Sequence, residues 1–451
     1  MEVSTLPDAD EVGTRAARGA LPLVTLDPAR YTSRAYAERE KRNLWPQVWQ
    51  IACREEEIAA PGDFVTYDIG DDSIIVTRTK SGEIVAYHNV CPHRGRRLAK
   101  GCGKAGLFRC GYHGWTFDLE GKNILVQDRE DWGGALDCEQ IDLHRVRVAS
   151  WGGFVWIDLR REGETLSEFL EEAPANLGPF EYEKMRYRWY VTVHLPCNWK
   201  VGVEAFIEGY HVAATHPQLL HIFGDDYTNS YARGKHSVFT YERGLAPLAT
   251  PSPRLNQPAP ADARPAVMEF FQTYEDTLKA MFTERDYQAS RGLMDVLPVA
   301  ADALTAFGTA VELGRRAAEA DGVGYPVDAT YEHMAKAGAD WHIFPNFVTL
   351  PWFDGALCYR ARPDGDDPDR CIFDIWSLVR YAPGKEPPLE RRVVRDPYAE
   401  SVSPIIDQDI SNMGEVQKGM KSSVFTKCRP NPVQEVPVIN FHHNLERYVG
   451  A

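Results

Sequence analysis

The sequence predicts an α+β protein in which a small antiparallel β domain precedes a larger domain of mixed helices and strands. Two observations carry this prediction. Short runs rich in Val, Ile, Tyr and Thr follow one another from Phe64 to Leu159, with Gly and Asp turn signals between them. After Arg160, stretches of helical periodicity alternate with further strand-like runs. The expected division is a lead-in over 1–39 that packs on the larger domain, a β domain over 40–160 and a mixed domain over 161–451.

The expected strands and helices follow this division along the chain. The strands expected in the small domain are 64–69, 73–78, 84–88, 107–109, 115–119 and 154–159. The larger domain is expected to contain a central antiparallel sheet flanked by helices. Its expected strands are 347–350, 356–362 and 371–381. Its expected helices are 164–172, 200–214, 266–285, 299–321 and 403–421.

Composition narrows the class of protein. The formal net charge of -15 argues against nucleic acid or an anionic membrane as the main partner. No uninterrupted apolar stretch of about 18 residues occurs, so no membrane span is expected, and the acidic N-terminus lacks the apolar run of a signal peptide. Nine cysteines without framework spacing indicate reduced thiols in a cytoplasmic protein, some of them serving a metal.

Two cysteines and two histidines alternate within the β domain. Sixteen residues separate Cys91-Pro-His93 from Cys110-Gly-Tyr-His113, and this order places one thiolate and one imidazole on each of two loops. A [2Fe–2S] cluster of the Rieske kind needs two Cys on one iron and two His on the other. A Cys2His2 zinc site would use the same residue types, but it normally has both cysteines on one arm and both histidines on the other. The alternating order favours the cluster.

The surrounding residues strengthen this interpretation. Asn89-Val-Cys91-Pro-His93-Arg-Gly95 and Leu107-Phe-Arg-Cys110-Gly-Tyr-His113-Gly-Trp115 resemble the Rieske domain of the aromatic-ring-hydroxylating oxygenase family. Respiratory Rieske proteins carry two further cysteines for a bracing disulfide, where this chain has Arg96 and Tyr112.

A second group of potential metal ligands lies at 208–217. Fe(II) that binds O2 is commonly held by two His and one carboxylate on one face. On a continuous helix His211 and His216 would project about 140° apart, because five residues advance about 500°. They can converge only if the helix ends between them, and Pro217 disfavours the α conformation at His216. Glu208 and His211 would share one helix face.

Residues 198–217 are also similar to the family's catalytic-helix signature, in which Asn-Trp-Lys precedes an acid, Tyr-His and His-Pro. The resemblance implies that His211 and His216 are iron ligands. It implies that Glu208 bridges a cluster histidine of one subunit and an iron histidine of its neighbour. Many relatives have Asp at the bridge, and Asn where Ala205 stands here. Glu204 is expected to be a supporting hydrogen-bond partner.

The third ligand is expected to be a carboxylate from a late acidic stretch. The stretch Ile406-Asp407-Gln-Asp409, opening a helix that ends in Val-Gln-Lys-Gly, looks like the family's segment that supplies this ligand, and the match implies Asp409. Asp407 and Asp354 are the alternatives, and Asp407 with Asp409 could instead cap a helix. Compared with relatives, residues of about 250–335 look like a helical insertion, which could form a lid, a pocket wall or a subunit contact.

The resemblance implies the terminal oxygenase component of a two-metal system, with one [2Fe–2S] cluster and one mononuclear Fe(II). Such a protein hydroxylates, dihydroxylates or oxidatively dealkylates a small organic substrate, which we expect to be aromatic. The chain has no dinucleotide fingerprint, so a separate NAD(P)H-dependent reductase, with or without a ferredoxin, is implied. A homotrimer is implied by electron transfer between subunits; a β subunit is left open. The alternatives are a Rieske electron-transfer protein without oxygenase activity and a zinc-stabilised binding module.

Overall fold

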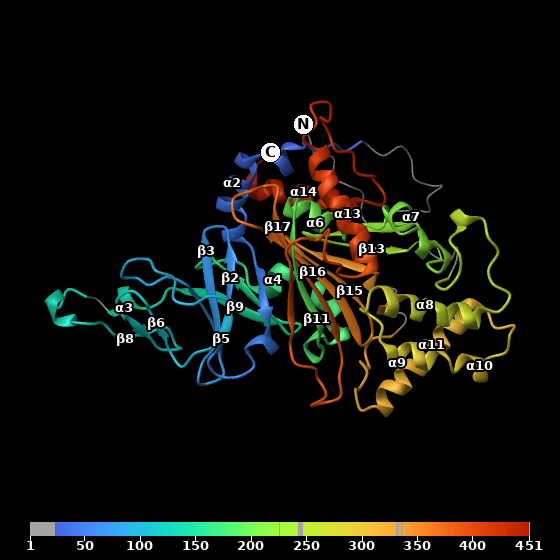
Figure 1. The fold of residues 1–451 in the computed structure, drawn as a ribbon, viewed down its shortest axis with the longest axis horizontal. Helices are drawn as coiled ribbons and strands as arrows, with labels where there is room; N and C mark the ends of the chain where they lie inside the picture. Colours follow the sequence, from blue (N-terminus) through green and yellow to red (C-terminus); the bar gives the residue numbers. More distant parts are fainter. Residues whose placement is uncertain are drawn as a thin grey trace.

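The structure is a computed structural model, and it describes residues 23–136, 138–224, 226–241, 247–330, 333–334 and 337–450. Figure 1 shows a narrow end built from residues 50–158 and a wide end built mainly from the later part of the chain. The N-terminal helix Arg34–Asn43 lies against the C-terminal helix Val436–Val449 of the wide end. Each end is organised around its own β-sheet. The predicted domain boundaries at 39/40 and 160/161 stay predictions. No helix in the described ranges is long and apolar enough to cross a membrane.

The narrow end contains a seven-stranded antiparallel sheet in the order β1-β10-β9-β4-β3-β2-β5. Its strands are β1 (Gln50–Arg54), β2 (Asp63–Ile69), β3 (Asp72–Arg78), β4 (Ile84–His88), β5 (Cys102–Lys104), β9 (Arg145–Trp151) and β10 (Phe154–Asp158). A small sheet carries β6 (Phe108–Arg109), β7 (Thr116–Phe117) and β8 (Asn123–Leu125) at the tip of this end. The observed β2, β3, β4 and β10 agree within one residue with the strands expected from alternating apolar residues and turn signals.

The wide end contains an eight-stranded sheet in the order β12-β13-β14-β15-β16-β17-β11-β18. All neighbours are antiparallel except β11 and β18, which are parallel. Its strands are β11 (Arg186–Leu195), β12 (Thr228–Arg233), β13 (His236–Tyr241), β14 (Asp340–Ile343), β15 (Phe347–Pro351), β16 (Gly355–Pro363), β17 (Cys371–Val379) and β18 (Arg391–Val394).

Helices surround this second sheet. The described α-helices are α1 (Ala29–Thr32), α2 (Arg34–Asn43), α3 (Cys138–Ile141), α4 (Leu166–Leu170), α5 (Ala173–Leu177), α6 (Trp199–Glu204), α7 (Val212–Thr215), α8 (Ala263–Thr277), α9 (Glu284–Ser290), α10 (Leu293–Val296), α11 (Ala303–Ala320), α13 (Pro404–Gly419) and α14 (Val436–Val449). The expectation of one helix over 200–214 is wrong, because α6 ends at Glu204 and α7 begins only at Val212. The expectation over 266–285 is also too long, since α8 ends at Thr277 and a separate α9 follows.

The two faces of the eight-stranded sheet have different neighbours. On one face, the Phe154 ring of β10 lies 5.1 Å from the Phe347 ring of β15, and the Arg360 guanidinium donates hydrogen bonds to the Ile51 and Ala52 carbonyls of β1 at 2.6 and 3.1 Å. The first sheet therefore packs directly on the second, through apolar rings and one buried, fully paired arginine.

The other face is covered by helices. His342 pairs with Val348, and Val348 pairs with Tyr359, so these three side chains project from the same face. The Phe206 ring, two residues beyond α6, stacks on Tyr359 at 4.1 Å, and Phe441 of α14 contacts His342 at 5.1 Å. This helix-covered face is the one that carries the second group of predicted ligands.

Candidate metal centres

The two Cys/His loops of the narrow end have matching backbones. In the first loop the Gly95 N–H donates to the Cys91 carbonyl at 2.9 Å, and in the second the Gly114 N–H donates to the Cys110 carbonyl at 3.0 Å. Both glycines have positive φ, +79° and +71°, which a residue with a side chain rarely adopts. Each loop is therefore a tight turn that presents one cysteine and one histidine.

The sulfur atoms lie among backbone N–H groups. The N–H groups of His93 and Arg94 approach Cys91, and those of Tyr112 and His113 approach Cys110. Burial raises the pKa of the Cys110 thiol, but the N–H donors, together with Cys91 and Arg96, hold it below its usual value overall. For Cys91 burial outweighs the N–H donors, and the pKa is raised. Backbone donors of this kind stabilise a thiolate, which is the form that ligates iron.

The two imidazoles face the same space. The His93 and His113 rings are 4.6 Å apart, and both Nδ1 atoms are buried without a hydrogen-bond partner. Burial and the neighbouring His113 lower the pKa of His93, which favours the neutral form that a metal requires. Two orphaned nitrogens beside two buried thiols fit a [2Fe–2S] cluster.

A single zinc ion fits these loops poorly. Among the described residues, only one group of three or more His, Cys, Asp or Glu side chains brings its ligand atoms all within 4.8 Å of one another, and the four loop residues do not form it. A tetrahedral zinc ion would need their four atoms around one point.

That one group is His211, His216 and Asp409. His211 directly precedes the single turn of α7 and His216 directly follows it, with φ -122° and ψ 53°. The helix thus ends at His216, just before Pro217, as the convergence of the two histidines requires. The two rings are 5.4 Å apart.

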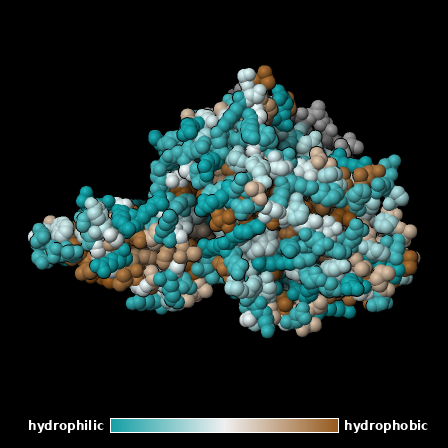
Figure 2. Space-filling model, in the orientation of Figure 1, coloured by the Kyte–Doolittle hydropathy of each residue, from teal (hydrophilic) through white to brown (hydrophobic). Residues whose placement is uncertain are grey.

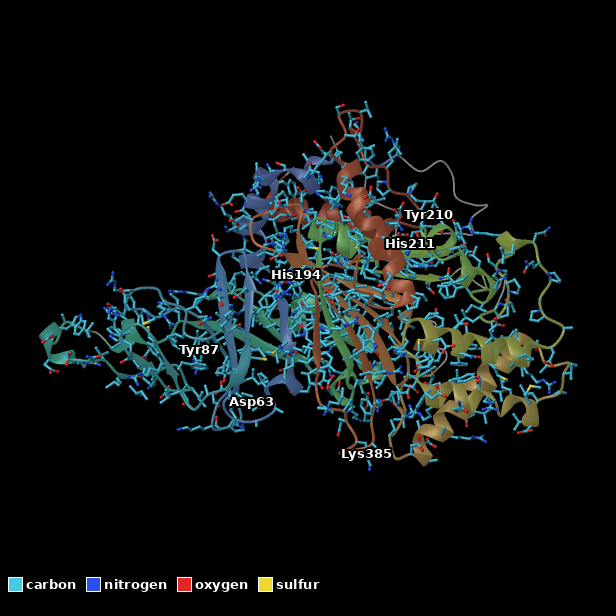
Figure 3. All side chains as sticks on the ribbon, in the orientation of Figure 1. Asp63, Tyr87, His194, Tyr210, His211 and Lys385 are labelled. Atoms are coloured by element: carbon cyan, nitrogen blue, oxygen red, sulfur yellow. The ribbon has the colours of Figure 1, made fainter. Side chains whose placement is uncertain are left out.

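Both histidines present the same nitrogen to Asp409, which lies on α13. The Nε2 atoms of His216 and His211 are 2.8 and 3.5 Å from the Asp409 Oδ1 atom. Their Nδ1 atoms are engaged elsewhere: that of His211 donates to Glu208 Oε1 at 2.7 Å, and that of His216 to Gln408 Oε1 at 2.7 Å. These outer hydrogen bonds fix the tautomer that leaves Nε2 available to a metal. Figure 3 labels His211 beside α13.

Without a metal, the charges of the trio favour a proton on His211 and an ionised Asp409. Burial lowers the pKa of His211, but the carboxylates of Glu208 and Asp409 outweigh it and raise the pKa to about 10. Burial raises the pKa of Asp409, but hydrogen bonds from both histidines hold it below its usual value. Two imidazoles and one carboxylate on one face are the donor set of non-haem Fe(II).

The comparisons with known proteins agree with this division. The family model described as "Ring hydroxylating alpha subunit (catalytic domain)" matches residues 182–451, and the one described as "Rieske [2Fe-2S] domain" matches residues 48–135. The first match covers more than half of the chain. The chain belongs to the ring-hydroxylating alpha-subunit family. It therefore has a Rieske [2Fe–2S] domain and a catalytic domain of the mononuclear non-haem iron type.

Curated relatives of this ring-hydroxylating alpha subunit match in part. The glycine betaine monooxygenase oxygenase subunit of Pseudomonas aeruginosa is 31% identical over 191 residues, covering 42% of this chain and 44% of the relative. The carnitine monooxygenase oxygenase subunit of Acinetobacter pittii is 32% identical over 222 residues, covering 48% and 58%. The chlorobenzene dioxygenase subunit alpha of a Cupriavidus strain is 30% identical over 200 residues, covering 42% and 43%. The chain thus matches about half the length of these relatives.

Solved structures show the same fold along nearly the whole chain. The quaternary ammonium Rieske monooxygenase CntA, in complex with an inhibitor, has a TM-score of 0.64 at 18% identity and covers 94% of this chain and 95% of its own. Naphthalene 1,2-dioxygenase from Rhodococcus sp. has a TM-score of 0.63 at 18% identity, covering 95% and 94%. At this identity the likeness establishes the fold alone.

The remaining predicted residues lie away from the trio or support it. Asp407 lies in the first turn of α13 and accepts from the Val402 N–H at 2.7 Å, while Ser403 is the cap of this helix. Asp354 is buried against Arg285. Neither belongs to the metal-ligand group. Glu204 accepts from the Tyr31 hydroxyl at 2.9 Å and contacts His442 Nε2 at 2.8 Å, as expected of a supporting partner.

Sequence reasoning missed Gln408, the residue that orients His216. Its position immediately before Asp409 was the signal that could have identified it, because neighbours of ligands often hold the outer hydrogen bonds. It also missed Tyr31 and His442, which come from opposite ends of the chain and meet only in the fold.

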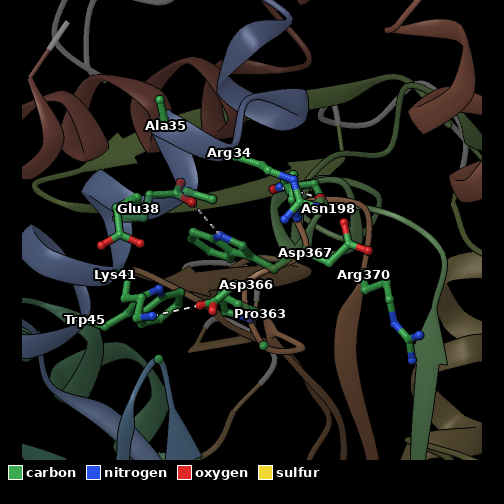
Figure 4. Close-up of a pocket in the computed structure, with 16 residues that line it drawn as sticks. Arg34, Ala35, Glu38, Lys41, Trp45, Asn198, Pro363, Asp366, Asp367 and Arg370 are labelled. Carbon is green, nitrogen blue, oxygen red and sulfur yellow. Dashed lines mark hydrogen bonds and ion pairs between the residues drawn. The ribbon is translucent and has the colours of Figure 1, made fainter.

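A pocket of about 390 Å³ lies elsewhere, between α2, the start of α6 and the connection from β16 to β17 (Figure 4). No predicted metal ligand lines it. Within it Lys41 pairs with Asp366 at 2.8 Å, and the Trp199 indole donates to Glu40 at 3.1 Å. Because none of the predicted metal ligands lines this pocket, we assign it no part in the metal chemistry.

Proposed function

We propose that this chain is the terminal oxygenase component of a Rieske non-haem iron system, and that it hydroxylates, dihydroxylates or oxidatively dealkylates a small organic molecule. One observation carries the proposal: two separate ligand sets, one of alternating Cys and His and one of two His and a carboxylate, occur in the same chain. When bound, the cluster supplies single electrons and the mononuclear iron supplies a site for O2.

The protein's own residues prepare the second site. Glu208 and Gln408 hold the Nδ1 protons, so both Nε2 atoms point at the position of the metal. His216 and Asp409 are buried, whereas His211 is partly exposed. With His211, His216 and Asp409 as ligands on one side, the opposite side would be left open for O2 and substrate.

Electron transfer is proposed to run between subunits. The cluster loops lie at the tip of the narrow end, and His211 lies in the wide end, on the far side of the large sheet (Figures 1 and 3). Figure 2 shows hydrophobic residues gathered on the narrow end, where the large exposed side chains include Leu107, Tyr112, Ile124 and Leu125. Tyr210, beside Glu208, is 51% exposed. These surfaces support a head-to-tail homotrimer in which Glu208 bridges the two centres.

The electrons are proposed to come from a separate NAD(P)H-dependent reductase, with or without a ferredoxin. The acidic chain, with a formal net charge of -15, suits docking to a donor with a basic face.

The expectation of an aromatic substrate is not confirmed. Relatives named as carnitine and glycine betaine monooxygenase subunits stand beside one named as a chlorobenzene dioxygenase subunit. We therefore propose a quaternary ammonium or related amine as the first candidate. An aromatic hydrocarbon is the second candidate, which the stacked rings of Phe206, Tyr359 and Phe373 support.

Metal analysis and oxygen uptake test the function together. The purified chain should contain about three irons and about two acid-labile sulfides. With a surrogate reductase, it should consume O2 faster when a fitting organic compound is added. Two irons without substrate-dependent uptake would indicate an electron-transfer protein, and zinc without sulfide would indicate a binding module.

A further inference from the structure

A buried carboxyl group without a partner lies on the helix-covered face of the large sheet. Asp340, the first residue of β14, is 2% exposed, and its Oδ1 atom has no hydrogen-bond partner. None of the ion pairs found among the described residues includes it, and burial alone raises its pKa well above the usual value. Nearly all buried polar groups are hydrogen-bonded, so an orphaned carboxyl calls for an explanation.

Asp340 faces the same side of the sheet as the metal trio. It lies two residues before His342, so both side chains project from one face, and His342 contacts Phe441 of the covering α14. Burial raises the pKa of Tyr359, and Asp409 and Asp340 are both near enough to raise it further. Tyr359 is therefore a neighbour of the metal ligand and of the orphaned carboxyl.

Aromatic rings surround this position. Tyr359 stacks on Phe206 at 4.1 Å, and Tyr274 of the insertion helix α8 is also close enough to act on the Tyr359 hydroxyl. Tyr274 in turn lies 6.3 Å from Phe223, which follows the His216-Pro217 segment. The helical insertion thus contributes a ring to the surroundings of the metal site.

Further unpaired polar atoms lie beside Asp340. Ser237 of β13 is the cross-strand partner of His342, and Phe239 is that of Asp340. The Ser237 hydroxyl and the His342 Nδ1 atom are buried without hydrogen-bond partners, like the Asp340 Oδ1 atom. The strands therefore place several neutral or acidic polar groups together, with no cation among the described side chains to balance the carboxyl.

We propose that Asp340 binds the positively charged nitrogen of the substrate, with Tyr359 and its neighbouring rings against the nitrogen's alkyl groups. A cationic amine or quaternary ammonium compound supplies a positive charge that can pair with the Asp340 carboxylate, and aromatic faces attract such cations. A neutral aromatic hydrocarbon would leave the carboxyl unpaired, as it is in the free protein, and so would gain nothing from it. This inference rests on the proposed oxygenase function and selects the substrate class for it.

The test compares ligands of equal shape and different charge. The metal-loaded full chain is titrated calorimetrically with choline against 3,3-dimethylbutan-1-ol, and with phenyltrimethylammonium against tert-butylbenzene. The wild type should bind the cation of at least one pair about tenfold or more tightly than its neutral counterpart, and Asp340→Asn should abolish that preference. Asp276→Asn removes the same charge from the exposed face of α8 and should leave the preference unchanged.

Stability provides an independent check. An unpaired buried carboxyl does not stabilise the fold, so Asp340→Asn and Asp340→Leu should unfold at the same temperature as the wild type or higher. A clear loss of stability in both variants would make Asp340 a structural residue and overturn the proposal. So would a wild type without preference for a cation in either pair, or an Asp340→Asn variant that keeps the preference.

Failure of the inference is distinguishable from failure of the proposed function. If a compound of either class stimulates O2 uptake while Asp340→Asn keeps the cation preference, the oxygenase function stands and the substrate-binding role of Asp340 falls. If the chain lacks labile sulfide and no compound stimulates uptake, the oxygenase function itself falls.

Discussion

The Lys200 ammonium of α6 lies 2.6 Å from the Glu40 carboxylate of α2, and both side chains are almost completely buried. The pair joins the N-terminal segment to the helix that leads into the metal-ligand region. Burial lowers the pKa of Lys200, and the attraction of Glu40, with a smaller contribution from Glu204, opposes this, so the ammonium depends chiefly on Glu40 for its charge.

We expect Glu40→Ala to destabilise the protein by about 3–5 kcal/mol, because it leaves a buried ammonium without a partner. The measurement is denaturant unfolding followed by circular dichroism. The double variant Glu40→Leu/Lys200→Met should recover most of the loss, since it removes both charges. Glu415→Ala, which breaks an exposed pair with Lys418, is the control and should have no measurable effect. A Glu40→Ala variant as stable as the wild type would show that the buried Lys200 does not need Glu40 as a partner.

His211→Ala should remove the mononuclear iron and leave the cluster intact. The visible absorption and the labile sulfide should stay at wild-type levels, iron should fall from about three to about two per chain, and substrate oxidation should cease. His221→Ala removes an exposed histidine five residues beyond His216 and should keep all three irons. Loss of the cluster absorption in His211→Ala would indicate that His211 supports the cluster and is not a ligand of the mononuclear iron.

Glu208→Gln should retain both metals and slow the transfer of electrons between them. The carboxylate that accepts from His211 Nδ1 becomes a neutral amide, so the proposed bridge loses its charge. We expect a decrease of about 10–100-fold in the rate of cluster oxidation during a single turnover, followed by stopped-flow absorption. Near-wild-type rates would exclude the bridging role.

Binding of Fe(II) to the metal-free trio should release a proton at pH 7.5. The pKa of His211 is about 10 without metal, so the imidazolium must lose its proton before Nε2 can ligate. Affinity should therefore rise with pH and level off only near pH 10. A released proton is taken up by the buffer, so calorimetry in two buffers of different ionisation enthalpy should give different binding heats. The same heat in both buffers would contradict proton release.

Mixing two inactive variants tests transfer between subunits. His211→Ala has an intact cluster, and Cys110→Ser keeps the mononuclear trio. If subunits exchange electrons across a head-to-tail contact, co-refolded or co-expressed mixtures should recover part of the wild-type oxygen uptake. Mixed oligomers, verified by two affinity tags, that remain inactive would indicate transfer within one chain.

Local patterns made the β-rich half of the fold predictable. Strands such as β2 and β4 have alternating apolar residues between Gly-containing turns, and the structure confirms them. The break before His216 followed from the geometry of a helix and from Pro217. By contrast, α14 was missed although Pro437 near its first turn is a start signal.

Contacts between distant segments were beyond the reach of such patterns. The meeting of Tyr31 with His442 and that of Tyr274 with Phe223 depend on packing, which periodicity does not encode. By contrast, β11 was missed although its run of aromatic and β-branched residues is a strand signal; only its pairing with β17 and β18 depends on the folded sheet. Local pattern also did not separate Asp409 from Asp407; the family resemblance implied Asp409, and the structure brings Asp409, not Asp407, together with the two histidines.

The buried Arg360 of β16 is bonded at once to two carbonyls of β1 and to Asp374 of β17. One side chain therefore fastens the first sheet to the second. The proposed transfer of electrons between subunits is compatible with this joint, because it does not require the narrow end to move relative to the wide end of its own chain.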